Sequence, residues 1–170
     1  MPELYASNSM PTKILVPIDF SPSSHIALEM AADLADHFHA ELVLVHVIPM
    51  FTSSTLPDFV PETTFLEEAR KSANGHFETV TKDLAGKGLK VSTLVEEGND
   101  VASSIMEAAE REGVDFLVIS THGLTGWHPV VFGSIAEKVI KLVNCPLLLL
   151  RSEKPESTAN VRSGRLMEWW

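Results

Sequence analysis

Short apolar runs of strand length alternate along the chain with longer segments of helical periodicity. Four of the runs are almost continuously apolar: Lys13–Asp19, Glu41–Ile48, Asp115–Ser120 and Pro146–Arg151. Continuous apolarity predicts strands that are covered on both faces. A further run, Lys90–Val95, is more polar and alternates in part. This pattern predicts a third strand near the edge of the sheet.

Between these runs, apolar residues recur at helical spacing, so each segment is expected to bury one stripe. The stripes comprise Ile26, Met30, Leu34 and Phe38 in the first segment, Phe65, Ala69, Ala73, Phe77, Val80 and Leu84 in the second, and Val101, Ile105 and Ala108 in the third. A fourth helical run covers Ile135–Val143. Ser21 followed by Pro22 predicts the start of the first helix, and Asn99 or Asp100 is expected to cap the third.

Strands that alternate with helices predict parallel pairing through right-handed crossovers. The expected fold is therefore α/β, a single-domain open doubly wound sheet of five parallel strands with helices on both faces. A strand order of 3-2-1-4-5 places the polar third strand at one edge and Leu147–Leu150 at the other. Because an unpaired apolar edge invites another chain, we predict a homodimer through this last strand.

We expect the chain to divide into a flexible N-terminal segment at 1–12, the domain at 13–151 and a C-terminal tail at 152–170. The tail ends on Trp169 and Trp170. These two indoles predict a contact with a protein client or with the chain itself, and a disordered end is the alternative. The single cysteine, Cys145, excludes an internal disulfide and is expected to be a small core residue.

Charge and apolarity narrow the possible partners and the location. The 170 residues include 13 basic and 23 acidic side chains, a net charge of −10 that repels nucleic acid and anionic membrane surfaces. No apolar run approaches the roughly 20 residues needed to span a bilayer. Residues 1–12 carry neither the basic nor the apolar region of a secretory signal. We therefore expect a cytoplasmic protein with no nucleic-acid partner and no membrane span.

In an open parallel sheet, ligands bind beyond the carboxyl ends of the strands where the strand order reverses. Here that point lies between the predicted first and fourth strands, which brings Pro17 and Asp19 opposite Ile119 and Ser120. The Asp19 carboxylate suits a ribose hydroxyl or a divalent cation. It also suits a purely structural role at the helix start beside Ser21.

The segment after the fourth strand has features of a phosphate site. Gly123 and Gly133 would let the backbone approach a ligand closely, and Ser134 opens a helix whose free N–H groups favour an anion. Glycines at this spacing are also common in ordinary loops that bind no ligand. At the end of the second strand, the backbone around Val47 would flank an adenine.

Three stretches, KILVPIDFS, LVEEG and STHGLTGWHPVVFGSIAEKVIKLVNCPLLLL, resemble the universal stress protein family over nearly the whole of 13–151. ATP-binding members of that family carry a glycine, two residues, a second glycine, nine residues, and then glycine with serine or threonine. Gly123 and Gly133-Ser134 match the later part of this motif. Ser120 stands where the first glycine belongs.

The resemblance implies ATP as the cofactor, with Mg²⁺ or Mn²⁺ as the candidate accompanying cation. It implies that the adenosine part meets Pro17, Asp19 and the Val47 backbone beside the end of the fourth strand at Ile119 and Ser120. The phosphates would meet Gly123, Gly133, Ser134 and the Ile135 amide. The loop 124–132 holds no lysine or arginine, so charge must be balanced by amides, a metal or His128.

Two functions follow from these observations. The first is a dimeric, ATP-binding regulator of the stress response. The second is a nucleotide-free dimerisation or interaction module in which Ser120 marks a degenerate site. We identify no catalytic residue, and any ATP hydrolysis is expected to be slow, because neither a positioned base nor an arginine for the transition state is found. Glu96 and Glu97 would suit a base but are more typical of a solvated strand end. A third function, nucleotidyl transfer, lacks its signature.

Overall fold

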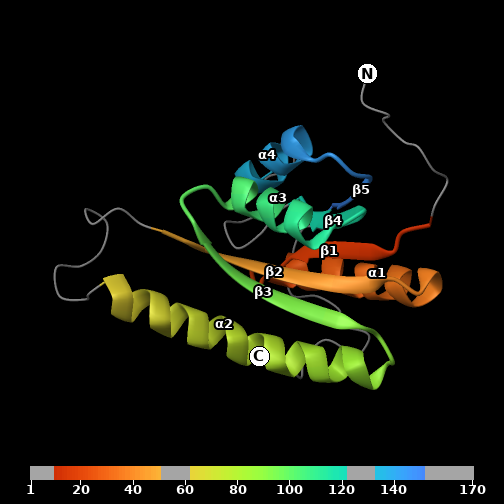
Figure 1. The fold of residues 1–170 in the computed structure, drawn as a ribbon, viewed down its shortest axis with the longest axis horizontal. Helices are drawn as coiled ribbons and strands as arrows, with labels where there is room; N and C mark the ends of the chain where they lie inside the picture. Colours follow the sequence, from red (N-terminus) through yellow and green to blue (C-terminus); the bar gives the residue numbers. More distant parts are fainter. Residues whose placement is uncertain (1–9, 51–61, 122–132, 152–170) are drawn as a thin grey trace, which may run out of the picture.

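The structure is a computed structural model that describes residues 10–50, 62–121 and 133–151. Within these residues strands and helices alternate in the order β1 (Lys13–Pro17), α1 (Pro22–Phe38), β2 (Glu41–Pro49), α2 (Glu62–Gly86), β3 (Val91–Gly98), α3 (Val101–Glu112), β4 (Phe116–Ser120), α4 (Ser134–Leu142) and β5 (Leu147–Leu150). The five strands are all parallel and lie in the order β3-β2-β1-β4-β5. This arrangement confirms the predicted α/β fold (Figure 1).

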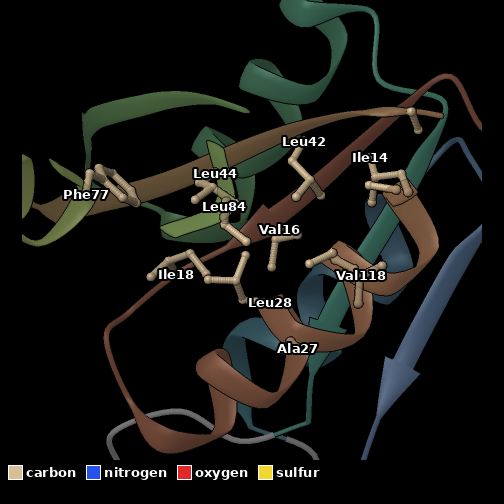
Figure 2. Packing of buried hydrophobic residues seen from close by; sticks show 14 residues of the cluster. Ile14, Val16, Ile18, Ala27, Leu28, Leu42, Leu44, Phe77, Leu84 and Val118 are labelled. Carbon is tan, nitrogen blue, oxygen red and sulfur yellow. The ribbon is translucent and has the colours of Figure 1, made fainter. Parts of the chain in front are cut away.

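Helices cover both faces of the sheet, α1 and α2 on one side and α3 and α4 on the other (Figure 1). Successive side chains of each strand point to opposite faces and divide the core in two. In β1, for example, Ile14 and Val16 face α1 and α2, whereas Leu15 faces α3 and α4. Figure 2 shows the cluster on the α1 and α2 side. Burial on both faces explains the continuous apolarity of the central strands.

The stripe predicted for the first helix is wrong in part. Ile26 and Met30 are 47% and 40% exposed, although Leu34 and Phe38 do pack against the core. The buried face of α1 instead consists of Ser24, Ala27, Leu28, Ala31, Ala32 and Ala35. A strict four-residue repeat drifts by about 40° per step around a helix of 3.6 residues per turn, so it cannot follow one face. Small residues on the buried face also let α1 lie close to the sheet.

The stripe predicted for α2 is confirmed from Ala73 onward: Ala73, Phe77 and Leu84 are buried and Val80 packs against the core. Phe65 and Ala69, in the first half of the helix, are only partly buried. Ser21 caps α1, with its hydroxyl oxygen accepting the Ser24 N–H at 3.1 Å. Asp100, rather than Asn99, caps α3.

The two predicted edge strands, β3 and β5, are the edges. On β3, Glu97 pairs with Arg70 of α2 at 2.6 Å and Glu96 pairs with Arg111 of α3. The two carboxylates that were considered as bases therefore serve in ion pairs that join the edge strand to both helix layers. Cys145 is half-buried beside the α3 and α4 cluster. Within the described residues, no helix has both the length and the apolarity of a membrane span.

Candidate functional site

A cavity of about 350 Å³ opens at the carboxyl edge of the sheet, between β1 and β4 where the strand order reverses. Small-molecule sites commonly measure about 300–1,000 Å³. Eight of the predicted site residues line it: Pro17, Asp19, Val47, Ile119, Ser120, Gly133, Ser134 and Ile135. The ninth, Gly123, lies outside the described residues, as do His128 and the rest of the segment 122–132.

One wall of the cavity is apolar and joins three elements. Val45 and Val47 of β2, Ile119 of β4, and Val101 and Ile105 of α3 contribute to it. The sequence analysis assigned the two α3 residues to a core stripe and did not place them at the site. Their position at the start of a helix that begins on the carboxyl edge was the available signal. An apolar wall of this kind suits the flat face of a ligand ring.

The backbone N–H and carbonyl of Val47 point to the side of β2 where β1 has already ended. In a parallel sheet, each residue directs its N–H and its carbonyl towards the same neighbouring strand, and successive residues alternate between the two neighbouring strands. The Val45 carbonyl accepts the Ile18 N–H of the β1 side at 2.8 Å, whereas the Leu42 N–H donates to Lys90 on the β3 side at 2.9 Å. Val47, two residues after Val45, therefore faces the β1 side beyond the point where that strand ends. Its N–H and carbonyl are placed to meet the edge of a ligand in the cavity.

Asp19 is placed for both of the roles that the sequence left open, support of the helix start and contact with a ligand. Its Oδ1 accepts the Ser21 backbone N–H at 3.1 Å and the Ser21 hydroxyl at 2.6 Å, which braces the start of α1. The same residue lines the cavity. The hydrogen bonds from Ser21 therefore also fix the position of the Asp19 carboxylate beside the cavity.

Phe20, between these two residues, adopts a left-handed backbone with φ of 60°. Such a conformation is strained for a bulky residue. Its ring lies 4.7 Å from the His46 ring and 4.7 Å from the His76 ring, and 5.6 Å from the Phe77 ring. The His46 Nδ1 donates to the Ile18 carbonyl at 2.7 Å, since a carbonyl only accepts. A clamp of rings therefore holds the turn that presents Asp19.

The N-terminal end of α4 faces the cavity with the N–H groups of its first turn. Gly133 is the N-cap and makes no side-chain cap bond, and Ser134, Ile135 and Ala136 of the first turn line the cavity. The first N–H groups of a helix have no acceptor within the helix, so they suit an anion. The Gly133 N–H donates to the Thr121 carbonyl at 2.8 Å and so fixes the helix start against the end of β4.

An ion pair joins α4 to the start of α3. Lys138 Nζ lies 2.8 Å from Asp100 Oδ2, while Asp100 Oδ1 accepts the N–H groups of Ala102 and Ser103. The Lys138 hydrogen bond, followed by the Ser103 N–H, holds the pKa of Asp100 below its ordinary value. In the described part of the chain, no three His, Cys, Asp or Glu side chains converge as in a protein-built metal site.

Comparison with known proteins identifies the family. The profile of the Universal stress protein family matches residues 10–151. The chain therefore belongs to this family, as its sequence motifs suggested.

Individual relatives agree with the family match. The chain is 32% identical to universal stress protein MJ0531 of Methanocaldococcus jannaschii over 85% of this chain and 84% of that protein. It is 33% identical to universal stress protein YxiE of Bacillus subtilis over 82% of this chain and 98% of that protein. The solved structure of MJ0577, also from M. jannaschii, superimposes with a TM-score of 0.75 at 31% identity over 86% of this chain and 99% of that chain.

Two more distant universal stress proteins share the fold and were solved with nucleotides. One, in complex with cAMP, has 21% identity and a TM-score of 0.56 over 84% of this chain and 98% of that chain. The other, from Archaeoglobus fulgidus in complex with dAMP, has 19% identity and a TM-score of 0.58 over 82% of this chain and 98% of that chain.

Proposed function

We propose that this chain is an ATP-binding universal stress protein that regulates the stress response as a dimer and holds its nucleotide in the cavity between β1 and β4. One observation carries the proposal: an apolar wall, a free-facing backbone edge and a helix N-terminus meet in a single cavity at the reversal of strand order. The first two surfaces suit the base and the third suits the phosphates, while Asp19 in the same cavity suits the sugar. The complexes of two relatives with adenine nucleotides support the same ligand class.

The proposed nucleotide lies across the cavity from β2 to α4. Its adenine packs on the apolar wall and meets the Val47 backbone, its ribose reaches Asp19, and its phosphates meet the start of α4 at Gly133, Ser134 and Ile135. Asp19 is also the carboxylate in this cavity that would share Mg²⁺ or Mn²⁺ with phosphate oxygens. Ser120 lines the cavity with a small side chain, and the proposal requires that it leave room for the ligand.

Calorimetric titration of the full chain with ATP and MgCl₂ tests the proposal. We expect micromolar binding by the wild type and loss of binding in Gly133→Gln, whose side chain would occupy the phosphate end. Gly75→Gln is the matched control, because a Cβ at this α2 position meets nothing within 4 Å and the residue does not line the cavity. A folded wild-type chain that binds no ATP would instead favour the nucleotide-free module.

The proposed role is regulatory, with at most slow hydrolysis. Glu96 and Glu97 are paired with arginines and do not line the cavity, so they are poorly placed to activate a water molecule there. We expect ATP to remain unhydrolysed over many minutes in a product assay. Rapid ATP-specific turnover by purified protein would contradict this part of the proposal.

We further propose that β5 forms the dimer contact. Leu147 and Leu149 pack towards one helix layer and Leu148 and Leu150 towards the other, and all four leucines stay partly exposed. Leu150 accepts the Thr121 N–H, so the alternating residues Leu147 and Leu149 direct their backbone groups outward. An apolar edge with unpaired backbone groups pairs readily with a second copy.

Light scattering on two variants of one residue tests this contact. Leu149→Pro removes an outward N–H without touching the bonds to β4, whereas Leu149→Ala removes the same side chain and keeps the N–H. We expect dimers from the wild type and from Leu149→Ala, and monomers from Leu149→Pro. A monomeric wild type would contradict the proposal.

The domain limits 13–151, a client for the tail at 152–170 and the cytoplasmic location stay predictions.

A further inference from the structure

We infer that Lys138 is the cation that recognises the terminal phosphates, and that it leaves Asp100 to do so, which makes the site favour ATP over AMP. This inference rests on the proposed function and names the feature of the ligand that the site selects. It concerns a residue that does not itself line the cavity and that no sequence motif pointed to.

The position of Lys138 on α4 directs it to the phosphate end. Helical side chains lean toward the helix N-terminus and cover the preceding turn. Lys138 lies one turn after Ser134 and Ile135, which line the cavity. Its four-carbon stem therefore runs over the turn whose N–H groups would meet phosphate, and rotation of the stem would bring the ammonium there.

The partner of Lys138 stands on the same rim. Asp100 directly precedes Val101, a residue of the apolar wall, and its Oδ2 lies 2.8 Å from Lys138 Nζ. The two side chains are 58% and 43% exposed. Ion pairs exposed to this degree contribute little to stability, so the lysine can change partners at small cost.

Exchange of the lysine leaves α3 intact. Asp100 caps α3 through Oδ1, which accepts the Ala102 and Ser103 N–H groups, and meets Lys138 through Oδ2. The cap bonds therefore persist when the lysine departs. The carboxylate acts as a holder that keeps the ammonium at the rim and screens its charge until a stronger anion arrives.

Charge balance gives the exchange its direction. The chain carries a net charge of −10, and a helix start supplies only about half a positive charge to a polyphosphate. Other cations already have carboxylate partners. Arg70 of α2 and Arg111 of α3 pair with glutamates of β3, and Lys141, one turn further along α4, pairs with Glu137. The Asp100 carboxylate and a phosphate oxygen both make charge-assisted hydrogen bonds with an ammonium, but a polyphosphate carries several negative charges and the carboxylate only one. Each phosphate beyond the first adds charge that the helix start does not balance, so a polyphosphate would gain more from Lys138 than a monophosphate would.

The test measures affinities for MgATP and AMP by calorimetry with full-length variants. We expect Lys138→Gln to weaken ATP binding about 10-fold, equivalent to about 1.4 kcal/mol, and AMP binding less than about 2-fold. Lys141→Gln, which makes the same change of charge on the same helix, is the matched control and is expected to change neither affinity by more than about 2-fold.

Asp100→Asn is expected to change the ATP affinity in the opposite direction. Asparagine caps a helix as well as aspartate does, but it no longer holds the lysine, so we expect ATP to bind about 2- to 3-fold more tightly. Thermal melting verifies that each variant is folded. If the wild type binds ATP and Lys138→Gln weakens ATP and AMP equally, or neither, the inference is overturned while the proposed function stands. A wild type that binds neither nucleotide overturns both.

Discussion

The left-handed turn at Phe20 leads to an unusual order of stability between two substitutions. Alanine normally stabilises relative to glycine, because glycine loses more backbone freedom on folding, about 0.4–1 kcal/mol. At φ of 60° this preference reverses. A residue with a Cβ pays about 1–2 kcal/mol in the left-handed region, whereas glycine enters it freely. We therefore expect Phe20→Gly to be more stable than Phe20→Ala by about 0.5–1 kcal/mol.

Both substitutions also remove the ring that His46, His76 and Phe77 hold. Truncation of a fully buried phenylalanine to alanine costs about 3–5 kcal/mol. Phe20 is only partly buried, so roughly half of this, about 2 kcal/mol, is expected for Phe20→Ala. Phe20→Gly should then cost about 1–1.5 kcal/mol, since its backbone strain is relieved.

Urea denaturation followed by circular dichroism measures both differences. Phe20→Leu, which keeps an apolar side chain and the strained backbone, separates loss of the ring from loss of all packing. The reasoning is refuted if Phe20→Ala is as stable as Phe20→Gly or more so, because the turn would then carry no strain. ATP affinity gives a second measurement. Both variants should weaken binding if the clamp positions Asp19.

Three further outcomes can be checked by denaturation. A Cβ at Gly98 would lie 2.1 Å from Ser104 Oγ and 3.3 Å from Ser104 Cβ, so Gly98→Ala should cost about 1–3 kcal/mol in the wild type and clearly less in a Ser104→Ala background, where only the Cβ contact remains; equal costs would contradict the clash. His39 ends α1 with φ of 56°, so His39→Gly should raise stability by about 0.5–1 kcal/mol, and a loss would exclude relief of strain. Because the pKa of Asp100 is lowered, its contribution is complete above the ordinary value of 3.8 and is lost as the pH falls through the lowered value. The stability difference between wild type and Asp100→Asn should therefore be constant from about pH 5 to 7 and shrink in more acidic buffer; a difference that grows in acid would contradict the ion pair with Lys138.

The sequence alone was enough to predict the elements, their order and the place of the cavity. Apolar runs buried on both faces can be recognised from a few neighbouring residues, and strands alternating with helices restrict a parallel sheet with right-handed crossovers to a few strand orders. The polar third run, which suits an edge, favoured the order 3-2-1-4-5 among them. Helix starts such as Ser21 and Asp100 depend on contacts within two or three residues. The position of the cavity then follows from strand order alone, which is why eight predicted residues line it.

Only the tertiary structure decided which side of α1 is buried, how Phe20 is clamped and where Lys138 lies. Ile26 and Met30 are apolar enough for a core, but the close approach of α1 to the sheet favours the alanines beside them. Lys138 and Asp100 are 38 residues apart in the chain. Local periodicity and capping rules reach only a turn or two along the chain, whereas these contacts depend on how whole helices meet across the sheet. The sequence therefore determined the frame and the location of the site, and the packing of the helices determined which side chains surround it.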